Sequence, residues 1–321
     1  MQNKILVIKH GALGDIVLAT GPFQAIRKHH PDAHITLLTT KPYMEMMRNS
    51  GYFDEIWVDS RPKIYNIFEF IRLIEKIRHA GFSRIYDLQT SERTGWYHKF
   101  MPSPKPEWVG TAVGASHRHD TPERTKLHTV ERQKQQLAIA GIHEPFTPDL
   151  SWLKASIGRF NLPKNFALIV AGGSAHRTGK RWPAHNYGII STWLATNGVT
   201  PVLIGTHSEE IVISTIETIC SDTINLLGQT SFAELAELAR HARCAVGNDT
   251  GPMHIIAITG CPSLILFSQF SDPLLCAPRG KSVKIIHEQV LAKLSPEKVI
   301  VWMKDYITNI GEQYDQLKNR R

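Results

Sequence analysis

The sequence lacks the features that mark several large classes of protein. It has no block of five or more like charges and no helix-turn-helix, zinc-finger or RRM signature, so we expect no nucleic-acid partner. Its most apolar stretch, residues 255–267, is interrupted by Gly260 and Pro262 and is shorter than the about 20 residues that span a bilayer. None of its four cysteines forms a Cys-x-x-Cys pair, so neither a metal site nor a disulfide is indicated.

The first residues also lack the basic region, apolar region and cleavage site of an export signal, so we expect a cytoplasmic protein. Lysine and arginine number 37 against 29 aspartates and glutamates, a net charge of +8 at pH 7. Most of this excess lies in the first 160 residues. A basic first half suits an anionic partner such as a phosphate or an acidic glycan, although ordinary surface charge explains it equally well.

Short apolar runs alternate with amphipathic segments along the chain, which predicts an α/β protein with parallel sheets covered on both faces. The alternation restarts after residues 143–164, where three prolines without periodicity indicate a linker. We therefore expect two Rossmann-like, doubly wound domains, residues 1–155 and 156–321, with ligands in a cleft at the carboxyl ends of their strands. The helical pattern in residues 296–317 can pack on either domain, including back on the first.

One turn in the second half has the composition of an anion site. Residues 247–254, Gly-Asn-Asp-Thr-Gly-Pro-Met-His, follow a strand-like run and open a helix. Such a turn directs backbone N–H groups and the positive end of the helix dipole to one place. Asp249 or Thr250 can cap the helix or contact a ligand hydroxyl. A well-capped helix without a ligand is the alternative interpretation.

The loop after the first strand of the second half, residues 172–183, combines glycines and Ser174 with basic residues. This composition suits a phosphate, and Lys180 can neutralise a departing diphosphate. The alternative is a solvated basic loop. Glu209 and Glu210, near another strand end, can bind ribose hydroxyls or can simply occupy the first turn of a helix.

The corresponding loop in the first half, residues 9–15, is a glycine turn that opens a helix. It has neither the dinucleotide Gly-x-Gly-x-x-Gly pattern nor a Walker loop. Asp15 either caps the helix or acts as a general base held at the cleft.

The first half also contains basic residues in loops and at helix starts that can hold acidic groups of an acceptor. Among them are Arg61, Lys63, Arg93 and Arg118, with ordinary surface charge as the alternative. Near Lys99, the apolar residues Trp96, Tyr97, Phe100 and Met101 form a mixed patch. We interpret it as the packed face of a short helix rather than a surface that touches a membrane.

Three motifs together carry a family resemblance: Gly11–Asp15, Lys180–Pro183 and Asp249–His254. In their order and approximate spacing they resemble the glycosyltransferase family 9 heptosyltransferases of bacterial lipopolysaccharide synthesis. The resemblance implies a GT-B fold, an ADP-heptose donor bound by the second domain and a lipid-linked anionic glycan acceptor bound by the first. It also implies inverting transfer that uses neither a metal ion nor a cofactor, and peripheral contact with the cytoplasmic face of the inner membrane.

Residue by residue, the resemblance implies that Asp15 is the catalytic base, with Gly14 beside it at the acceptor, and that Lys180 binds the diphosphate. It assigns donor contacts to Asp249, Thr250, Gly251 and His254, and less closely to Glu210 and Ser174, where the loop departs from the family pattern. Three alternatives stay open. They are a protein O-heptosyltransferase, a GT-B enzyme that uses another nucleotide sugar, and a nucleotide-binding protein without catalysis.

Overall fold

The computed structural model describes residues 3–61, 67–101, 103–173 and 178–307 of the 321-residue chain. The chain divides into two compact units, Met1–Trp152 and Leu153–Arg321. This division falls close to the boundary that we predicted after residue 155. No helix in the described part of the chain is long and apolar enough to cross a membrane.

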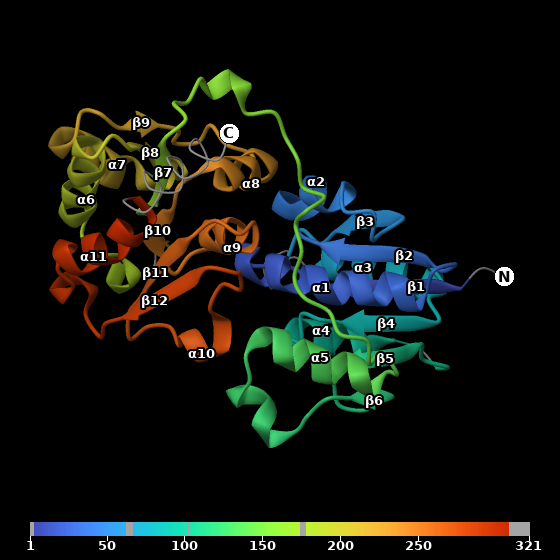
Figure 1. Ribbon diagram of the computed structural model, residues 1–321. Helices are drawn as coiled ribbons and strands as arrows, with labels where there is room; N and C mark the ends of the chain where they lie inside the picture. Colours follow the sequence, from blue (N-terminus) through green and yellow to red (C-terminus); the bar gives the residue numbers. More distant parts are fainter. Residues whose placement is uncertain (1–2, 62–66, 102, 174–177, 308–321) are drawn as a thin grey trace, which may run out of the picture. The chain divides into compact units, whose positions relative to one another are not determined.

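The first unit contains a six-stranded sheet in the order β3-β2-β1-β4-β5-β6, with every neighbouring pair parallel (Figure 1). Its strands are β1 (Lys4–Ile8), β2 (His34–Thr39), β3 (Glu55–Val58), β4 (Arg84–Asp87), β5 (Glu107–Gly110) and β6 (His117–Arg118). Its helices are α1 (Leu13–His29), α2 (Lys41–Arg48), α3 (Ile67–His79), α4 (Glu92–Phe100) and α5 (Thr129–Ile139), with a 3-10 turn at Pro122–Lys126.

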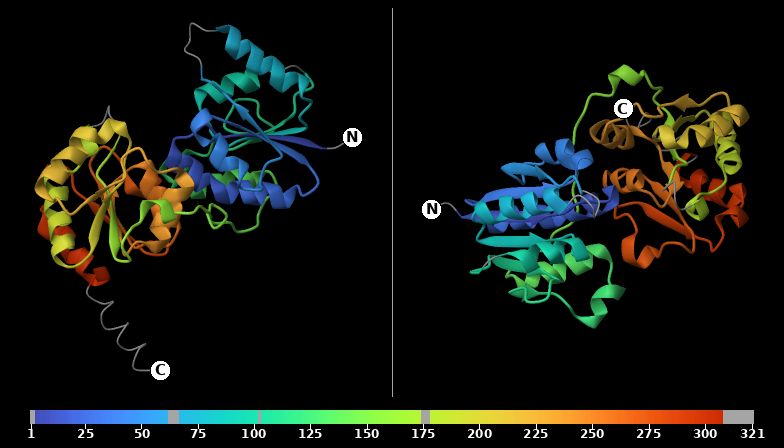
Figure 2. Two further views of the ribbon diagram at one scale, coloured as in Figure 1. Left: turned by 90° about the horizontal axis from the view of Figure 1, so that it is seen from above. Right: turned by 180° about the vertical axis from the view of Figure 1, so that it is seen from behind.

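Both faces of this sheet are covered, which explains why β1 is apolar at successive positions rather than at alternate ones. Leu6 and Ile8 pack in a core with residues of α3 and α4. On the opposite face, α1 lies beside α5 (Figures 1 and 2). Since all the strands run in one direction, the loops that follow β1, β3 and β4 meet at a single edge of the sheet.

The second unit repeats this architecture, with strand order β12-β11-β10-β7-β8-β9 and parallel pairing throughout. Its strands are β7 (Phe166–Val170), β8 (Thr200–Leu203), β9 (Ile224–Asn225), β10 (Ala245–Asn248), β11 (Ser263–Phe267) and β12 (Val283–His287). Its helices are α6 (Ala184–Thr196), α7 (Glu210–Ile219), α8 (Phe232–His241), α9 (Gly251–Ile258), α10 (Pro273–Cys276) and α11 (Pro296–Ile307).

One face of the second sheet is covered by α6, α7 and α11, whose apolar residues share a buried core with β7, β8, β10 and β11. On the other face, α8 packs against α9 (Figure 2). Val299 and Met303 place α11 in the core of this second unit. The rest of the helix predicted over residues 296–317 lies outside the described residues. The expectation of two doubly wound, Rossmann-like units is confirmed.

Candidate active site

A buried asparagine fixes the edge of the second sheet where the motifs meet. Asn248, the last residue of β10, is fully buried. Its amide nitrogen donates to the carbonyls of Ala171 and Gly172, both at 2.9 Å. Its oxygen accepts from the Trp182 backbone N–H and the Tyr187 hydroxyl, also at 2.9 Å. One side chain therefore joins the loop after β7, the Lys-Arg-Trp-Pro motif and the strand before the Asp249 turn.

Lys180 and Asp249 are brought together at this edge. The Lys180 ammonium lies 2.8 Å from the Asp249 carboxylate and donates to Ser271 Oγ at 2.8 Å. Ser271 also donates to the same carboxylate oxygen. Since Asp249 directly precedes the amino end of α9, a cation and the positive end of a helix dipole lie near each other. This combination suits an anion such as a diphosphate.

The turn at α9 differs from one expectation about its side chains. Thr250 is the N-cap residue, but its side chain makes no capping hydrogen bond. Of the two roles open to this side chain, capping is therefore excluded and contact with a ligand hydroxyl stays open. Gly251 and Pro252 form the first turn, where proline is tolerated because its missing N–H has no partner in the helix. His254 lies on the buried side of the same helix.

The loop after β7 approaches an acidic side chain closely. A Cβ atom at Gly172 would lie 2.8 Å from Glu209 Cγ, so only glycine fits beside this residue. Glu209 is buried and accepts hydrogen bonds from the Thr206 N–H at 2.8 Å, the Thr206 hydroxyl at 2.7 Å and the Ser208 hydroxyl at 2.7 Å. Burial alone would raise its pKa, but these hydrogen bonds outweigh burial and lower the pKa.

Glu210, the residue matched to a ribose contact, is exposed at the first position of α7. The carboxylate next to the glycine loop is thus its neighbour, Glu209. Arg181 donates to the Gly173 carbonyl at 2.6 Å, which fixes the described end of this loop. Ser174 lies outside the described residues.

In the first unit, Asp15 occupies the first turn of α1. Its Oδ2 accepts from the Ala12 N–H at 3.0 Å, so the capping interpretation of this residue is confirmed. Within the described part of the chain, no group donates to Oδ1, which leaves one oxygen able to accept a proton. Gly11 has φ +120°, and a Cβ there would lie 2.5 Å from the Tyr43 ring. Glycine is therefore required at position 11, in the turn that leads into α1 and Asp15.

A buried ion cluster lies beside this turn. Asp59, just after β3, accepts from Arg93 Nε at 3.0 Å, from the Tyr97 hydroxyl at 2.6 Å and from the Arg61 backbone N–H at 2.7 Å. Burial alone would raise the pKa of Asp59, but hydrogen bonds from Tyr97 and Arg93 lower it. The His10 ring nitrogen lies 3.3 Å from the same carboxylate, yet burial and nearby cations lower the His10 pKa to about 4. His10 is therefore neutral at pH 7.

A second group of charges lies at the end of β4. Asp87 is buried, which raises its pKa to about 6, and it accepts from the Thr90 N–H at 2.9 Å. Arg124 donates to the Thr90 hydroxyl at 2.8 Å, and Lys9 donates to the Leu88 carbonyl at 3.1 Å. Burial lowers the pKa of Lys9, and the neighbouring charge of Asp15 partly opposes that shift. Cations thus accumulate around one buried acid.

The residues predicted to bind the acceptor do not all share this edge. Arg93 and Arg61 belong to the Asp59 cluster, and Gly14 is buried in the first turn of α1. Arg118 lies on the edge strand β6 and forms an exposed ion pair with Asp120 at 2.7 Å. Lys63 lies outside the described residues. The sequence analysis did not select His10, Asp59, Asp87 or Ser271, whose roles depend on contacts between distant segments.

Among the residues that the structure describes, no group of three or more histidine, cysteine, aspartate or glutamate side chains could hold a metal ion. The charged groups described at the two sheet edges instead contact one another, backbone groups or hydroxyls. The sheet edge of the first unit thus carries the Asp15 carboxylate, and the sheet edge of the second unit carries the Lys180 ammonium near the amino end of α9.

Comparison with known proteins shows which family the chain is related to. The chain is 31% identical to lipooligosaccharide heptosyltransferase 2 of Haemophilus influenzae over 128 residues, a match that spans only 36% of that relative and 37% of this chain. It is 29% identical to lipooligosaccharide heptosyltransferase 2 of Haemophilus ducreyi over 313 residues, 88% of both proteins.

A solved structure of Escherichia coli ADP-heptose LPS heptosyltransferase II superposes with a TM-score of 0.79 at 20% identity, covering 96% of this chain and 99% of that one. The likeness confirms the expected GT-B fold. The sequence model of glycosyltransferase family 9 (heptosyltransferase) matches residues 70–300. With that match over most of its length, the chain belongs to glycosyltransferase family 9, the heptosyltransferases.

Proposed function

We propose that this protein transfers heptose from ADP-heptose to an inner-core lipopolysaccharide acceptor, with inversion at the anomeric carbon and without a metal ion. The observation that carries the proposal is the Lys180 ammonium held beside the amino end of α9 by Asp249 and Ser271. A leaving diphosphate gains negative charge during transfer. Preorganised positive groups at that position stabilise the transition state more than the ground state.

Asp15 is the proposed base. Its Oδ2 is held by the Ala12 N–H, so the carboxylate has a fixed orientation, and Oδ1 takes the proton of the acceptor hydroxyl. That oxygen then attacks the anomeric carbon from the face opposite ADP, the bond to the diphosphate breaks, and the configuration inverts. Fixed cations supply the charge neutralisation that a metal ion provides in other transferases.

The donor and acceptor are assigned to different units. In the second unit, we assign Lys180 and the backbone N–H groups at Thr250 and Gly251 to the ADP diphosphate. Asp249, which pairs with Lys180, is assigned to a hydroxyl of the donor, and a glutamate at the start of α7, Glu209 or Glu210, to the ribose. In the first unit, we assign the acidic groups of the acceptor to the sheet edge that carries Arg93, Lys9 and Arg124. The excess of cations around Asp87 supports this assignment, because bound phosphate or carboxylate would relieve their mutual repulsion.

The test is turnover measured by mass spectrometry with ADP-heptose and lipid A core acceptors of increasing length. UDP, GDP and CMP sugars and a serine-containing peptide are included as competing donors and acceptors. We expect product only with ADP-heptose and a core acceptor. Product on the peptide would indicate protein O-heptosylation, and ADP binding without product on any acceptor would indicate a binding protein.

Two variants separate the role of charge from the role of local packing. Lys180→Ala removes the cation, whereas Ser271→Ala removes a neighbouring contact of Asp249 and keeps the cation. We expect Lys180→Ala to lower kcat by about 10²- to 10³-fold, as for loss of one preorganised electrostatic group. The Ser271→Ala variant should stay within about tenfold of wild type, and equal losses in both variants would contradict the role of Lys180.

A further inference from the structure

Helix α4 exposes aromatic side chains that its own domain does not cover. Trp96 and Phe100 lie one helical turn apart and are 47% and 52% exposed. Their rings stack with centroids 5.8 Å apart and an interplanar angle of 21°. Val113, in the loop after β5, is 80% exposed. Contiguous exposed apolar groups of this kind mark interaction sites rather than ordinary surface.

The neighbouring helix extends this surface. Phe70 of α3 contacts Phe100, with ring centroids 6.2 Å apart. The same helix exposes Phe68 and Ile71. We call Phe68, Ile71, Trp96, Phe100 and Val113 the aromatic surface.

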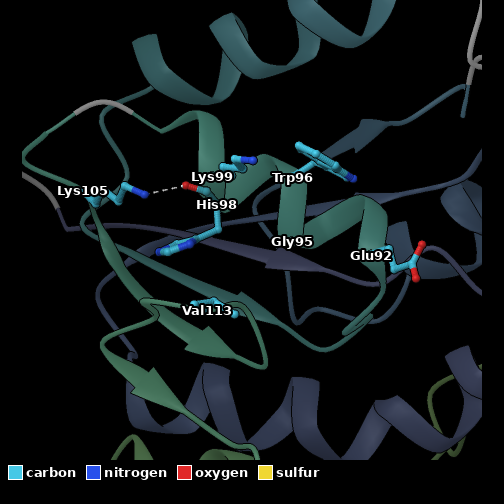
Figure 3. Close-up of a pocket in the computed structure, with 7 residues that line it drawn as sticks. All are labelled: Glu92, Gly95, Trp96, His98, Lys99, Lys105 and Val113. Atoms are coloured by element: carbon cyan, nitrogen blue, oxygen red, sulfur yellow. Dashed lines mark hydrogen bonds between the residues drawn. The ribbon is translucent and has the colours of Figure 1, made fainter.

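Basic groups accompany these rings. Lys99 Nζ lies 4.5 Å from the centroid of the Trp96 ring, and Lys105 donates to the His98 carbonyl at 3.0 Å. Figure 3 shows both lysines around a shallow hollow of about 630 Å³. Glu92 lies at the end of the hollow away from Lys105 (Figure 3), while Glu69 of α3 accepts a hydrogen bond from Ser60. Positive charge therefore lies next to exposed aromatic rings.

We propose that the aromatic surface docks on a phospholipid bilayer that contains anionic lipids. Tryptophan and phenylalanine insert at the boundary between headgroups and acyl chains, and lysines beside them pair with lipid phosphates. A protein partner fits less well, because the buried centres of protein interfaces are depleted of lysine and Lys99 lies directly on the Trp96 ring. The proposal rests on the proposed function in one respect, since a lipid-linked acceptor requires the enzyme to work at a membrane.

The experiment measures partitioning of the full-length protein onto vesicles of phosphatidylcholine with and without phosphatidylglycerol, at low ionic strength and without substrates. We expect wild type to prefer the anionic vesicles. The double variant Trp96→Ser/Phe100→Ser should bind at least about tenfold more weakly, because two aromatic side chains no longer leave water. Lys99→Gln should weaken binding to anionic vesicles by about fivefold and leave binding to neutral ones unchanged.

Matched controls come from exposed apolar residues of the other unit. Ile211 on α7 and Val301 on α11 are both exposed, and the variant Ile211→Ser/Val301→Ser should bind vesicles as wild type does. Trp96→Phe should retain binding but lose much of the quenching of tryptophan emission by brominated lipid. This variant reports insertion of that ring without a large change in packing.

Activity on a short acceptor without acyl chains separates the two proposals. If the docking inference holds, Trp96→Ser/Phe100→Ser keeps that activity and loses vesicle binding. Unchanged vesicle binding in the double variant, or no binding by wild type to either vesicle, would overturn the inference even if the enzyme is active. A change in oligomeric state without a change in vesicle binding would also overturn it. An inactive wild type that docks through this surface would overturn the proposed function alone.

Discussion

Two substitutions at Asp15 separate its two roles. The carboxylate accepts from the Ala12 N–H at the amino end of α1, and it is also the proposed base. Asp15→Asn keeps an oxygen that can accept this hydrogen bond but cannot take up a proton at neutral pH. Asp15→Ala removes both the hydrogen bond and the base. A structural role and a catalytic role therefore predict different results for this pair.

The expected losses of folding stability and of catalytic rate differ enough in size to be distinguished. Loss of the charge near the helix end should cost about 0.3–1 kcal/mol in Asp15→Asn, and loss of the hydrogen bond as well should bring Asp15→Ala to about 1–2 kcal/mol. A domain stable by at least about 5 kcal/mol stays almost completely folded after either change. Loss of a general base lowers kcat by about 10²- to 10⁴-fold, or about 3–5 kcal/mol in the activation free energy.

The assay combines single-turnover kinetics, urea unfolding and ADP binding for wild type, Asp15→Asn and Asp15→Ala. We expect similar large losses of activity in both variants, a larger loss of stability in Asp15→Ala, and unchanged ADP affinity. Glu234→Gln is the control, because Glu234 Oε2 accepts from the Ser231 N–H at 2.9 Å in a comparable capping arrangement on α8. Activity within tenfold of wild type in Asp15→Asn would refute the base assignment and leave only the cap.

Two further predictions concern stability. Burial lowers the pKa of His10 to about 4, so between pH 6.5 and pH 4 the unfolded chain binds a proton that the folded chain does not. This contribution to stability is present above pH 6.5 and decreases as the pH falls, by about 2 kcal/mol from pH 7 to pH 5. Urea unfolding at both pH values should show a smaller decrease in His10→Gln than in wild type, and an unchanged decrease in His79→Gln, a variant of an exposed residue. An equal decrease in all three proteins would contradict the role of His10. Asn248→Ala leaves four buried groups without their hydrogen-bond partner and should lower the free energy of unfolding by about 4 kcal/mol or more. Tyr187→Phe removes one donor and should lower it by about 1 kcal/mol. Equal urea midpoints for the two variants would contradict this role of Asn248.

The order of helices and strands was largely predictable because the apolar runs are short, bounded by turn residues and separated by amphipathic segments. The strands β3 (Glu55–Val58) and β11 (Ser263–Phe267), for example, coincide with short β-like runs in the sequence. The two-residue strand β6 was missed, because a segment that short has no period. Its pairing with β5 is a tertiary contact that local pattern does not encode.

The site was predictable only where a motif is contiguous. Lys180 and Asp249 are separated by 69 positions in sequence, and each motif pointed to the same sheet edge, so their proximity was expected. The choice between Glu209 and Glu210 was not predictable from sequence. The side chain that turns inward depends on the hydrogen bonds from Thr206 and Ser208 and on the space left by Gly172.

Helix α4 shows why the sequence could not settle the question of membrane contact. Its apolar residues fall on two faces: Tyr97 and Met101 are buried, as predicted for a packed helix, whereas Trp96 and Phe100 are exposed, so the prediction was wrong for that pair. Periodicity cannot rank two apolar faces of one short helix, because either can turn to the core. Tyr97 is directed inward by its hydrogen bond to the buried Asp59. With Tyr97 held inward, the adjacent face of the helix, with its stacked rings and Lys99, is exposed to a partner outside the domain.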